Sequence, residues 1–325
     1  MGLVLSIPVS SLIIGAGGQD GYYLTRELAS RGRKVIGIDR RLPEKNRQVD
    51  HPMVDYVEID IREYEKFALF LEETNPAEVY HLAAVHGSAG SEYEQIWRDM
   101  LAVNTGSLHV ILEYFRNLRP DSWLFYASSC LVFGPLTGTI NEDTRKSGAD
   151  LYAICKKAGC ELLEYYRSKH GISSLATHFF NHESPLRDPS FFISRIISIL
   201  NHALNDPSYI GEIYNLDFHC DWGSAKEYME LVADAADRGI NGELIIATGE
   251  AVFARDLVHQ LFELHGLNYR DHIKEMVTDN EIKDPSDSPP FRADLRRLQE
   301  LVGRRPRQTI LDICEEVLEA RRGHH

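Results

Sequence analysis

The sequence is poor in cysteine, in basic residues and in long apolar runs. It has five cysteines among 325 residues and no Cys-x-x-Cys pair, which disfavours both a disulfide framework and a zinc site. Lysine and arginine number 35 against 49 aspartates and glutamates, for a formal net charge of -14. Clustered positive charge is what binds phosphate backbones and anionic lipids. We therefore predict no nucleic-acid partner, no membrane partner and no metal centre.

No apolar run approaches the roughly 20 residues that span a bilayer. The apolar opening, residues 1–14, has no lysine or arginine ahead of it and contains Pro8, unlike a secretory signal peptide. With so few cysteines, the simplest expectation is a reducing, cytoplasmic location. The length and the 43% hydrophobic content suffice for a large core, in one large or two modest domains.

A glycine-rich turn joins an apolar run to an amphipathic one near the start of the chain. Residues 11–24 read Ser-Leu-Ile-Ile-Gly-Ala-Gly-Gly-Gln-Asp-Gly-Tyr-Tyr-Leu, with glycines at 15, 18 and 21. A strand, loop and helix of this kind bring the backbone close to a diphosphate and aim helix N–H groups at it. The next apolar run, 34–38, ends before Asp39, about 20 residues past the loop, where a ribose-binding carboxylate is expected. The pattern predicts a dinucleotide site.

Short apolar runs alternate with helical patterns over the first 180 residues. Strands are predicted at 57–60, 78–84, 123–129 and 174–180, and helices at 63–73, 92–118 and 152–170. Repeated β-α-β units build a doubly wound parallel sheet, the α/β Rossmann fold. Prolines interrupt the pattern beyond residue 181. We predict a Rossmann domain over 1–180 and 213–240, with 213–239 returning to the sheet, and a smaller discontinuous C-terminal substrate domain over 181–212 and 241–325.

A second motif begins the last of these helices. Tyr152 and Lys156 are four residues apart and share one helical face, so the ammonium group can lie near the phenol. A nearby cation favours phenolate and lowers a phenol pKa that is ordinarily near 10. The pair therefore predicts a base that acts on a hydroxyl group.

Several blocks together resemble the extended short-chain dehydrogenase/reductase superfamily and, within it, the GDP-mannose 4,6-dehydratases. The superfamily blocks are Gly15 to Gly21, His81-Leu82-Ala83-Ala84, Asn104, Ser128-Ser129 and Tyr152 to Lys156, and the narrower matches are 17–24, 181–187, 220–228 and 246–250. The resemblance implies an NAD- or NADP-dependent enzyme that acts on a nucleoside-diphosphate sugar. It places the cofactor in the first domain and the sugar nucleotide in the second.

The resemblance also implies roles for single residues. Tyr152 would take the proton of the sugar 4-hydroxyl, Lys156 would hold the nicotinamide ribose, and Ser129 would bond to the same sugar oxygen. Asn181 and Arg187 would contact the nucleotide diphosphate. The cofactor-binding set is Gly15, Gly18, Gln19, Asp20, Gly21, Asp39, Arg40, Asp60, Ile61, Leu82, Ala83, Ala84 and Lys156.

Three further expectations concern partners and the cofactor. Arg255 and Arg292 lie in the predicted substrate domain and are candidate phosphate ligands on charge alone. Asp39 favours NAD by repelling a 2′-phosphate, whereas Arg40 and Arg41 favour NADP, and we give NAD a slight preference. The resemblance implies a homodimer through a four-helix interface of 92–118 and 152–170, which the apolar and aromatic positions Trp97, Leu101, Leu112, Tyr165 and Tyr166 allow.

The chain departs from the dehydratases at the residue that removes the C5 proton. The dehydratases carry glutamate two places after the serine or threonine, and here Leu131 stands there. Loss of such a base costs about 10²- to 10⁴-fold. Cys130, His86 or His182 could replace it, although a buried cysteine is more commonly a packing residue and a loop histidine is more commonly a hydrogen-bonding residue than a catalyst.

We therefore favour an epimerase or oxidoreductase with hydride transfer at C4. Dehydration with a substitute base is one alternative. A non-catalytic dinucleotide sensor is another, although a sensor would have no need of the Tyr152–Lys156 pair.

Overall fold

A computed structural model describes residues 10–86, 93–276 and 289–322. The chain divides into two compact units, Met1–Gly134 with Lys146–Phe179 and Met229–Leu244, and Pro135–Arg145 with Phe180–Tyr228 and Ile245–His325. Residues 135–145 and 213–228, which we had assigned to the Rossmann domain, fall in the second unit. No helix in the described ranges is both long and apolar enough to cross a membrane.

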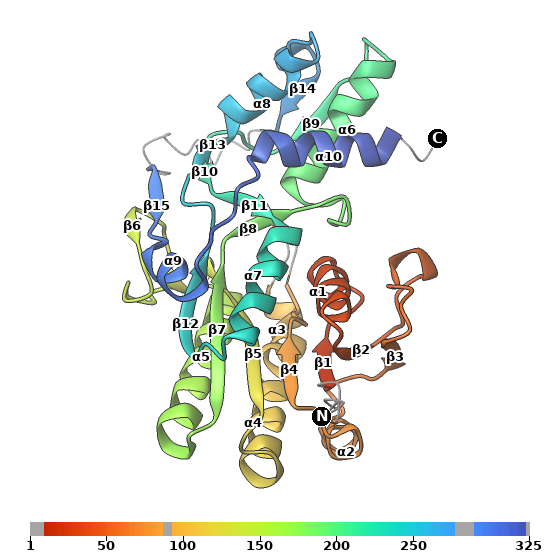
Figure 1. The fold of residues 1–325 in the computed structure, drawn as a ribbon. Helices are drawn as coiled ribbons and strands as arrows, with labels where there is room; N and C mark the ends of the chain where they lie inside the picture. The colour runs from red at the N-terminus through yellow and green to blue at the C-terminus, as the bar shows by residue number, and fades with distance from the viewer. Residues whose placement is uncertain (1–9, 87–92, 277–288, 323–325) are drawn as a thin grey trace, which may run out of the picture. The chain divides into compact units, whose positions relative to one another are not determined.

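The first unit is built on a seven-stranded sheet in the order β12-β7-β5-β4-β1-β2-β3 (Figure 1). Its registered pairs, from β3 through β7, are all parallel. The predicted α/β Rossmann fold is therefore confirmed. The strands are β1 (Ser10–Ile14), β2 (Lys34–Asp39), β3 (Val54–Glu58), β4 (Glu78–His81), β5 (Trp123–Ser129), β7 (Ser173–Phe179) and β12 (Gly242–Ile246).

One prediction about the sheet was wrong. We expected residues 213–239 to return to it, but the added strand is β12, over 242–246, and the preceding stretch contains helix α7 (Ala225–Asp237). The apolar residues of α7 recur with helical rather than strand periodicity.

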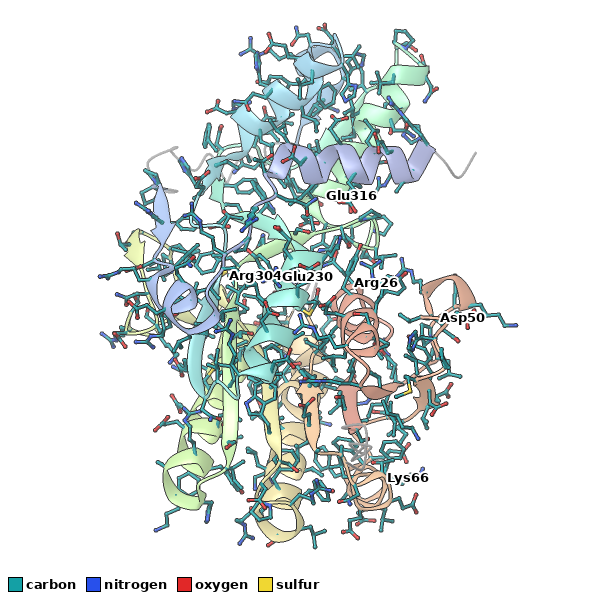
Figure 2. The ribbon with its side chains drawn as sticks, in the orientation of Figure 1. Arg26, Asp50, Lys66, Glu230, Arg304 and Glu316 are labelled. Carbon is teal, nitrogen blue, oxygen red and sulfur yellow. The ribbon has the colours of Figure 1, made fainter. Side chains whose placement is uncertain are left out.

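Helices pack on the sheet through one shared core. Apolar residues of α2 (Tyr64–Thr74), α4 (Ser107–Leu118) and α5 (Leu151–His170) form a buried cluster with residues of β1, β4, β5 and β7. The remaining helices of this unit are α1 (Gln19–Ser30), α3 (Tyr93–Leu101) and part of α7, with 3-10 turns at Lys45–Arg47 and Cys130–Phe133. Charged side chains such as Asp50 and Lys66 lie on the outside (Figure 2).

The predicted long helix at 92–118 is interrupted by a single π-helical turn. Residues 102–106 form this turn between α3 and α4, and residue 92 lies outside the described ranges. The wider turn brings Asn104 onto the loop after β4, where its amide accepts from Val85 N at 2.8 Å and donates to Val85 O at 3.0 Å. A π turn of this kind often marks a functional site.

The second unit has its own apolar core. Two long helices, α6 (Phe192–Asn205) and α10 (Ile310–Arg322), pack with α8 (Ala254–Leu264) around it. The described part of this unit also contains four short strand pairs: β6 with β15, β8 with β11, β9 with β14, and β10 with β13. The strands are β6 (Gly138–Ile140), β15 (Phe291–Ala293), β8 (Asn181–Glu183), β11 (Trp222–Ser224), β9 (Gly211–Ile213), β14 (Ile273–Glu275), β10 (His219–Cys220) and β13 (Val252–Phe253). The described residues of the unit also form α9 (Arg296–Val302) and a 3-10 turn (Tyr269–Asp271).

Candidate active site

The loops after β1 and β4 border a cavity of about 730 Å³ in the first unit. They meet where the strand order reverses, the position at which doubly wound sheets bind ligands. Nine of the predicted cofactor residues line it together: Gly15, Gly18, Asp39, Arg40, Asp60, Ile61, Leu82, Ala83 and Ala84. The lining also includes Val85, His86, Arg62 and Asp99, of which only His86 had been singled out from the sequence.

Two glycines close the loop tightly against its neighbours. Gly15 has a φ of +89°, and a Cβ on it would lie 2.7 Å from the backbone nitrogen of Ala83. A Cβ on Gly21 would lie 2.3 Å from the carbonyl oxygen of Gly15. Larger residues would push the loop off the strand ends. Gln19, Asp20 and Gly21 form the first turn of α1.

Asp39, at the end of β2, faces the cavity. Its carboxylate accepts from Gly17 N at 3.2 Å and from Arg40 N at 2.7 Å. These two bonds fix the carboxylate beside the glycine loop. Arg40 lines the same cavity.

Asp60 is held by an arginine that the sequence analysis did not consider. Arg62 bonds to Asp60 through Nη2 at 2.6 Å and to Asp99 through Nη1 at 2.9 Å. Hydrogen bonding to Arg62 lowers the pKa of Asp60. Asp60 therefore reaches the cavity as an ionised carboxylate that is already part of an ion-pair chain.

The Tyr152–Lys156 pair lies in the first turns of α5, which Asp150 caps by accepting from Ala153 N at 2.7 Å. The Lys156 Nζ atom is 5.7 Å from the Tyr152 ring centre and donates to the carbonyl of Ala127 at 2.7 Å. Burial lowers the pKa of Lys156 to about 8. At neutral pH the ammonium form still predominates, so a cation lies beside the phenol.

Ser129 is the last residue of β5, and Leu131 lies on the 3-10 turn that follows it. The Ser129 hydroxyl oxygen accepts from Leu131 N at 3.2 Å. Because this bond uses a lone pair, the hydroxyl hydrogen can still donate. Leu131 is 36% exposed, whereas Cys130 between them is 5% exposed.

The two candidate histidines lie in different surroundings. The His86 ring packs edge-on against Tyr152, with ring centres 4.4 Å apart and an interplanar angle of 87°. His182, in the second unit, is buried, bonds through Nδ1 to the carbonyl of Phe180 at 2.8 Å and lies against Tyr228. Of the two, His86 is the one that contacts a predicted catalytic residue.

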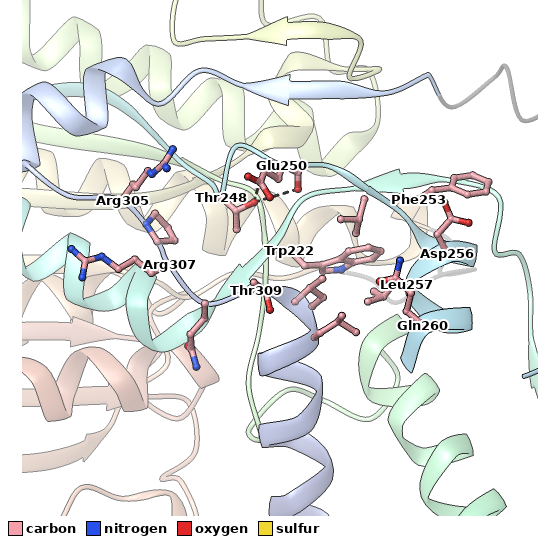
Figure 3. Close-up of a pocket in the computed structure, with 15 residues that line it drawn as sticks. Trp222, Thr248, Glu250, Phe253, Asp256, Leu257, Gln260, Arg305, Arg307 and Thr309 are labelled. Carbon is pink, nitrogen blue, oxygen red and sulfur yellow. Dashed lines mark hydrogen bonds between the residues drawn. The ribbon is translucent and has the colours of Figure 1, made fainter. Parts of the chain in front are cut away.

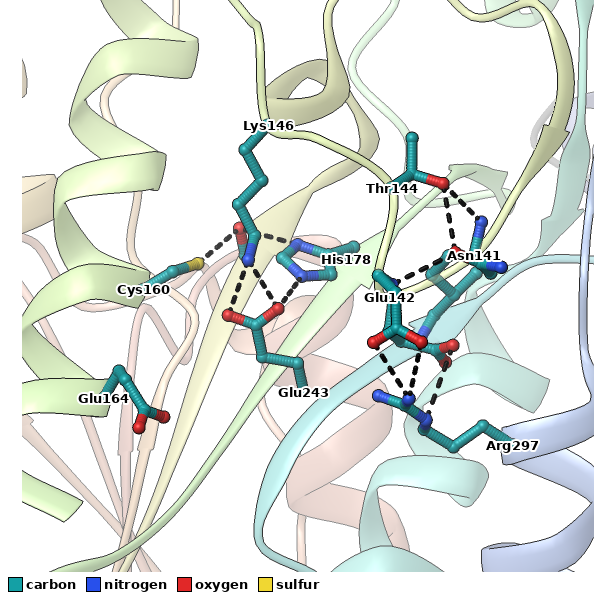
Figure 4. Close-up of polar contacts among 12 residues, drawn as sticks. Asn141, Glu142, Thr144, Lys146, Cys160, Glu164, His178, Glu243 and Arg297 are labelled. Atoms are coloured by element: carbon teal, nitrogen blue, oxygen red, sulfur yellow. Dashed lines mark hydrogen bonds and ion pairs between the residues drawn. The ribbon is translucent and has the colours of Figure 1, made fainter. Parts of the chain in front are cut away.

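Cys160, His178, Lys146 and Glu243 form a polar cluster (Figure 4) that Ser128 joins. The Ser128 hydroxyl contacts Cys160 Sγ at 3.3 Å and His178 Nδ1 at 3.2 Å. The other ring nitrogen of His178 contacts Glu243 at 3.1 Å, and Lys146 Nζ bonds to the same carboxylate at 2.6 Å. Cys160, His178 and Glu243 are close enough for one metal ion, but the Lys146 ammonium already neutralises the carboxylate, so we assign no metal here.

The predicted phosphate ligands of the second unit differ in their surroundings. Arg187 packs its guanidinium 3.6 Å from the Phe191 ring centre, and Asn181 is an exposed residue of β8. Arg255 is engaged by Asp217 at 2.7 Å and by Glu275 at 2.6 Å. Arg292 is exposed and lines a hollow of about 940 Å³ with Arg296 and Arg305.

A separate cavity of about 630 Å³ lies in the second unit between β13, α8 and the chain before α10 (Figure 3). Trp222 lies in its middle, Leu257 at the end formed by α8, and Arg305 and Arg307 at the opposite end. None of the four predicted phosphate ligands is among the described residues that line it.

Comparisons with known proteins decide the family. A model of the GDP-mannose 4,6 dehydratase family matches residues 12–317. The chain belongs to the GDP-mannose 4,6-dehydratase family. It is a nucleotide-sugar modifying enzyme of the extended short-chain dehydrogenase/reductase type, as the sequence motifs predicted.

Individual relatives agree with this membership. The GDP-mannose 4,6-dehydratase of Vibrio cholerae is 30% identical over 265 residues, which cover 76% of this chain and 70% of that protein. GDP-mannose 4,6 dehydratase 1 of Arabidopsis thaliana is 28% identical over 316 residues, with 91% and 85% covered.

Solved structures share the fold. The dTDP-glucose 4,6-dehydratase of Bacillus anthracis, in complex with NAD, has a TM-score of 0.82 at 17% identity, covering 98% of this chain and 97% of that one. UDP-glucose 4-epimerase of Thermotoga maritima, with UDP-glucose, has a TM-score of 0.82 at 18% identity, covering 97% and 99%.

Proposed function

We propose that this family member oxidises the C4 hydroxyl of a nucleoside-diphosphate hexose, a GDP-sugar by its family, and uses the transient 4-ketone for epimerisation or net oxidation. The observation that carries the proposal is the buried Lys156 ammonium 5.7 Å from the ring centre of Tyr152. A phenol beside a cation is a base suited to the oxidation of an alcohol.

The proposed roles follow from the contacts. Tyr152 takes the proton of the 4-hydroxyl while the hydrogen on C4 leaves as hydride. Ser129 donates to the same oxygen, since its lone pair already accepts from Leu131 N. Lys156 spends one N–H on the carbonyl of Ala127 and has two left for a ribose hydroxyl.

The cavity of the first unit suits a dinucleotide cofactor. The glycine loop leaves no room for side chains at Gly15 or Gly21, and Asp39 presents a carboxylate that can accept from ribose hydroxyls. A nicotinamide cofactor supplies the hydride acceptor when bound. A 2′-phosphate would face Asp39, so we propose NAD, with NADP as the alternative because Arg40 also lines the cavity.

The net reaction depends on Leu131. Its aliphatic side chain cannot accept a proton. The site therefore has no carboxylate at the position where the GDP-mannose 4,6-dehydratases that the sequence resembles carry a glutamate. We therefore favour an outcome that keeps the C6 hydroxyl. Loss of water remains the alternative, and it requires a substitute base.

Substrate binding is proposed for the second unit, which holds the predicted residues 181–212 and, of the predicted 241–325, all but 241–244. Asn181, Arg187 and Arg292 are the proposed diphosphate ligands. Arg255 is the weakest of the set, because the carboxylates of Asp217 and Glu275 already occupy its guanidinium.

We also propose a homodimer through α3, α4 and α5. Leu101, on α3, is 42% exposed and Tyr165, on α5, is 54% exposed, whereas Leu112 and Tyr166 are buried against their own unit. Leu101 and Tyr165 are therefore the most exposed residues of the predicted set, and Trp97 is partly buried.

The decisive experiment compares wild type with Tyr152→Phe. Each protein is incubated with GDP-mannose and either NAD or NADP in deuterated water, and reduced nicotinamide and product masses are followed. We expect reduction by wild type, a loss of at least about 10²-fold in the variant, and equal cofactor binding by both.

The product mass then identifies the outcome. An unchanged elemental composition with deuterium incorporated indicates epimerisation next to the transient ketone, loss of two hydrogens indicates net oxidation, and loss of water supports the dehydratase alternative. If wild type reduces no cofactor with any sugar nucleotide and Tyr152→Phe binds cofactor identically, a non-catalytic dinucleotide sensor explains the chain better.

A further inference from the structure

The turn after β5 has leucine instead of a carboxylate at residue 131, and the loop after β4 offers a histidine as a proton carrier. His86 ends the described part of that loop, is exposed, and lines the same cavity as the glycine loop and Asp39. Imidazole is the side chain that enzymes use most often for proton transfer near neutral pH.

Two tyrosines hold the His86 ring. The ring lies edge-on against Tyr152, with ring centres 4.4 Å apart, and Nε2 lies 3.5 Å from the hydroxyl of Tyr93. Tyr152 and Tyr93 belong to one apolar cluster with Met100 and Cys155. The imidazole is therefore positioned by packing against the residue that contacts O4 in the proposed reaction.

The other titratable groups near Tyr152 in the described part of the first unit are less suitable. Cys130 is 5% exposed, which limits proton exchange with solvent. The Asp150 carboxylate accepts from the backbone of α5 as its N-cap. Lys156 bonds to a backbone carbonyl and has the role beside the phenol.

We infer that His86 is a catalytic base that removes the proton from the carbon next to the transient C4 ketone. This inference rests on the proposed function. An imidazole nitrogen takes the proton, the C–H electron pair forms a double bond to C4, and the carbonyl electron pair moves onto O4. Reprotonation of the carbon reverses the step, and the exposed imidazolium exchanges its proton with water.

The contact between the two rings fits a mechanism in which Tyr152 acts on O4 and His86 acts on the adjacent carbon. After the oxidation step the Tyr152 hydroxyl carries the proton it took from the sugar, so it can donate a hydrogen bond to the enolate oxygen. The base must then reach the adjacent carbon, one bond away from C4. Two side chains in ring contact can serve neighbouring atoms of one sugar ring.

The test separates the two steps in one reaction. Wild type, His86→Gln and His259→Gln are incubated with GDP-mannose and NAD in deuterated water, and both reduced nicotinamide and deuterium in the sugar are measured. We expect His86→Gln to keep nicotinamide reduction within about 10-fold of wild type and to lose at least about 10²-fold in deuterium incorporation. His259, exposed on α8, is the matched control and should leave both unchanged.

Rescue experiments distinguish a base from a packing residue. Imidazole added to His86→Ala, and Leu131→Glu added to His86→Gln, should each restore deuterium incorporation, because either returns a base to the site. Unimpaired exchange in His86→Gln, or reduction by wild type without any exchange, would overturn the role of His86 and leave the proposed function standing. Absence of reduction in wild type would instead overturn the proposed function and this inference with it.

Discussion

Lys156 combines a functional role with a cost to stability. Its side chain is 1% exposed, and burial lowers its pKa from 10.5 to about 8. The unfolded chain therefore binds more protons than the folded one between these values, so stability rises as the pH increases from about 8 to 10.5. Below pH 8 the buried ammonium costs on the order of 3 kcal/mol.

Lys156→Met should therefore stabilise the fold while abolishing the chemistry. Removing the buried charge gains about 3 kcal/mol, and losing the bond to the carbonyl of Ala127 costs about 1 kcal/mol, which leaves a gain of about 2 kcal/mol. Urea unfolding at pH 7 without cofactor measures it. Lys157→Met, at the partly exposed neighbouring position, should change little.

A less stable Lys156→Met protein would show that the hydrogen bond outweighs the desolvation of the ammonium. The expected pattern, higher stability with lost nicotinamide reduction, is typical of residues kept for activity rather than for folding. The same pattern is not expected when Ser129 is substituted, because the Ser129 hydroxyl is not a buried charge.

At the scale of elements, the buried cluster around Glu243 joins β5, β7, β12 and α5. Burial pushes the pKa of Glu243 up, but hydrogen bonds and charge from His178 and Lys146 outweigh it and bring the pKa to about 2. A depressed carboxylate contributes stability that is complete above its unfolded pKa of 4.5 and is lost as the pH falls toward 2.

Glu243→Gln should lose about 2 kcal/mol of stability at pH 6 and match wild type near pH 2. The measurement is urea unfolding across this range. Glu164→Gln is the control, since Glu164 lies on α5 but its side chain is 63% exposed. A difference from wild type that stays constant between pH 6 and pH 2 would mean that shape, not charge, gives Glu243 its effect.

The sequence predicted some elements closely because their signals are local. The predicted helix at 152–170 is α5, 151–170, which has Asp150 as its N-cap and Gly171 in the left-handed region as its C-cap. The glycine loop was equally readable. By contrast, the π turn at 102–106 depends on how Asn104 bonds to the loop after β4, which no local pattern encodes.

The residues of the candidate site that follow strand ends could be predicted from the sequence. The contacts between residues far apart in the sequence could not. Parallel strands bring Gly15, Asp39 and Ala83 to one edge, so their joint cavity could be anticipated. The approach of His86 to Tyr152 joins residues 66 positions apart in the sequence, and the capture of Arg255 by Asp217 and Glu275 depends on folding of the second unit. Residue type alone made Arg255 look available.

At the scale of the whole molecule, net charge opposes association. Each chain carries a formal charge of -14, so two copies repel each other through solvent, and salt screens this repulsion with a Debye length of about 10 Å at 0.1 M. If α3, α4 and α5 form the dimer, apolar contacts must overcome that repulsion. The dissociation constant of the dimer should therefore fall as salt is added.

Analytical ultracentrifugation can test both parts of the dimer prediction. We expect a dimer that tightens between 20 mM and 300 mM salt, roughly as charge screening requires, and a monomer for Leu101→Asp combined with Tyr165→Asp. Leu69→Asp is the matched control, because Leu69 is 59% exposed on α2, outside the proposed interface. A dimer that survives the double substitution but not the control would place the interface on α2, and a dimer that loosens with salt would mean that ion pairs rather than apolar side chains hold the two copies together.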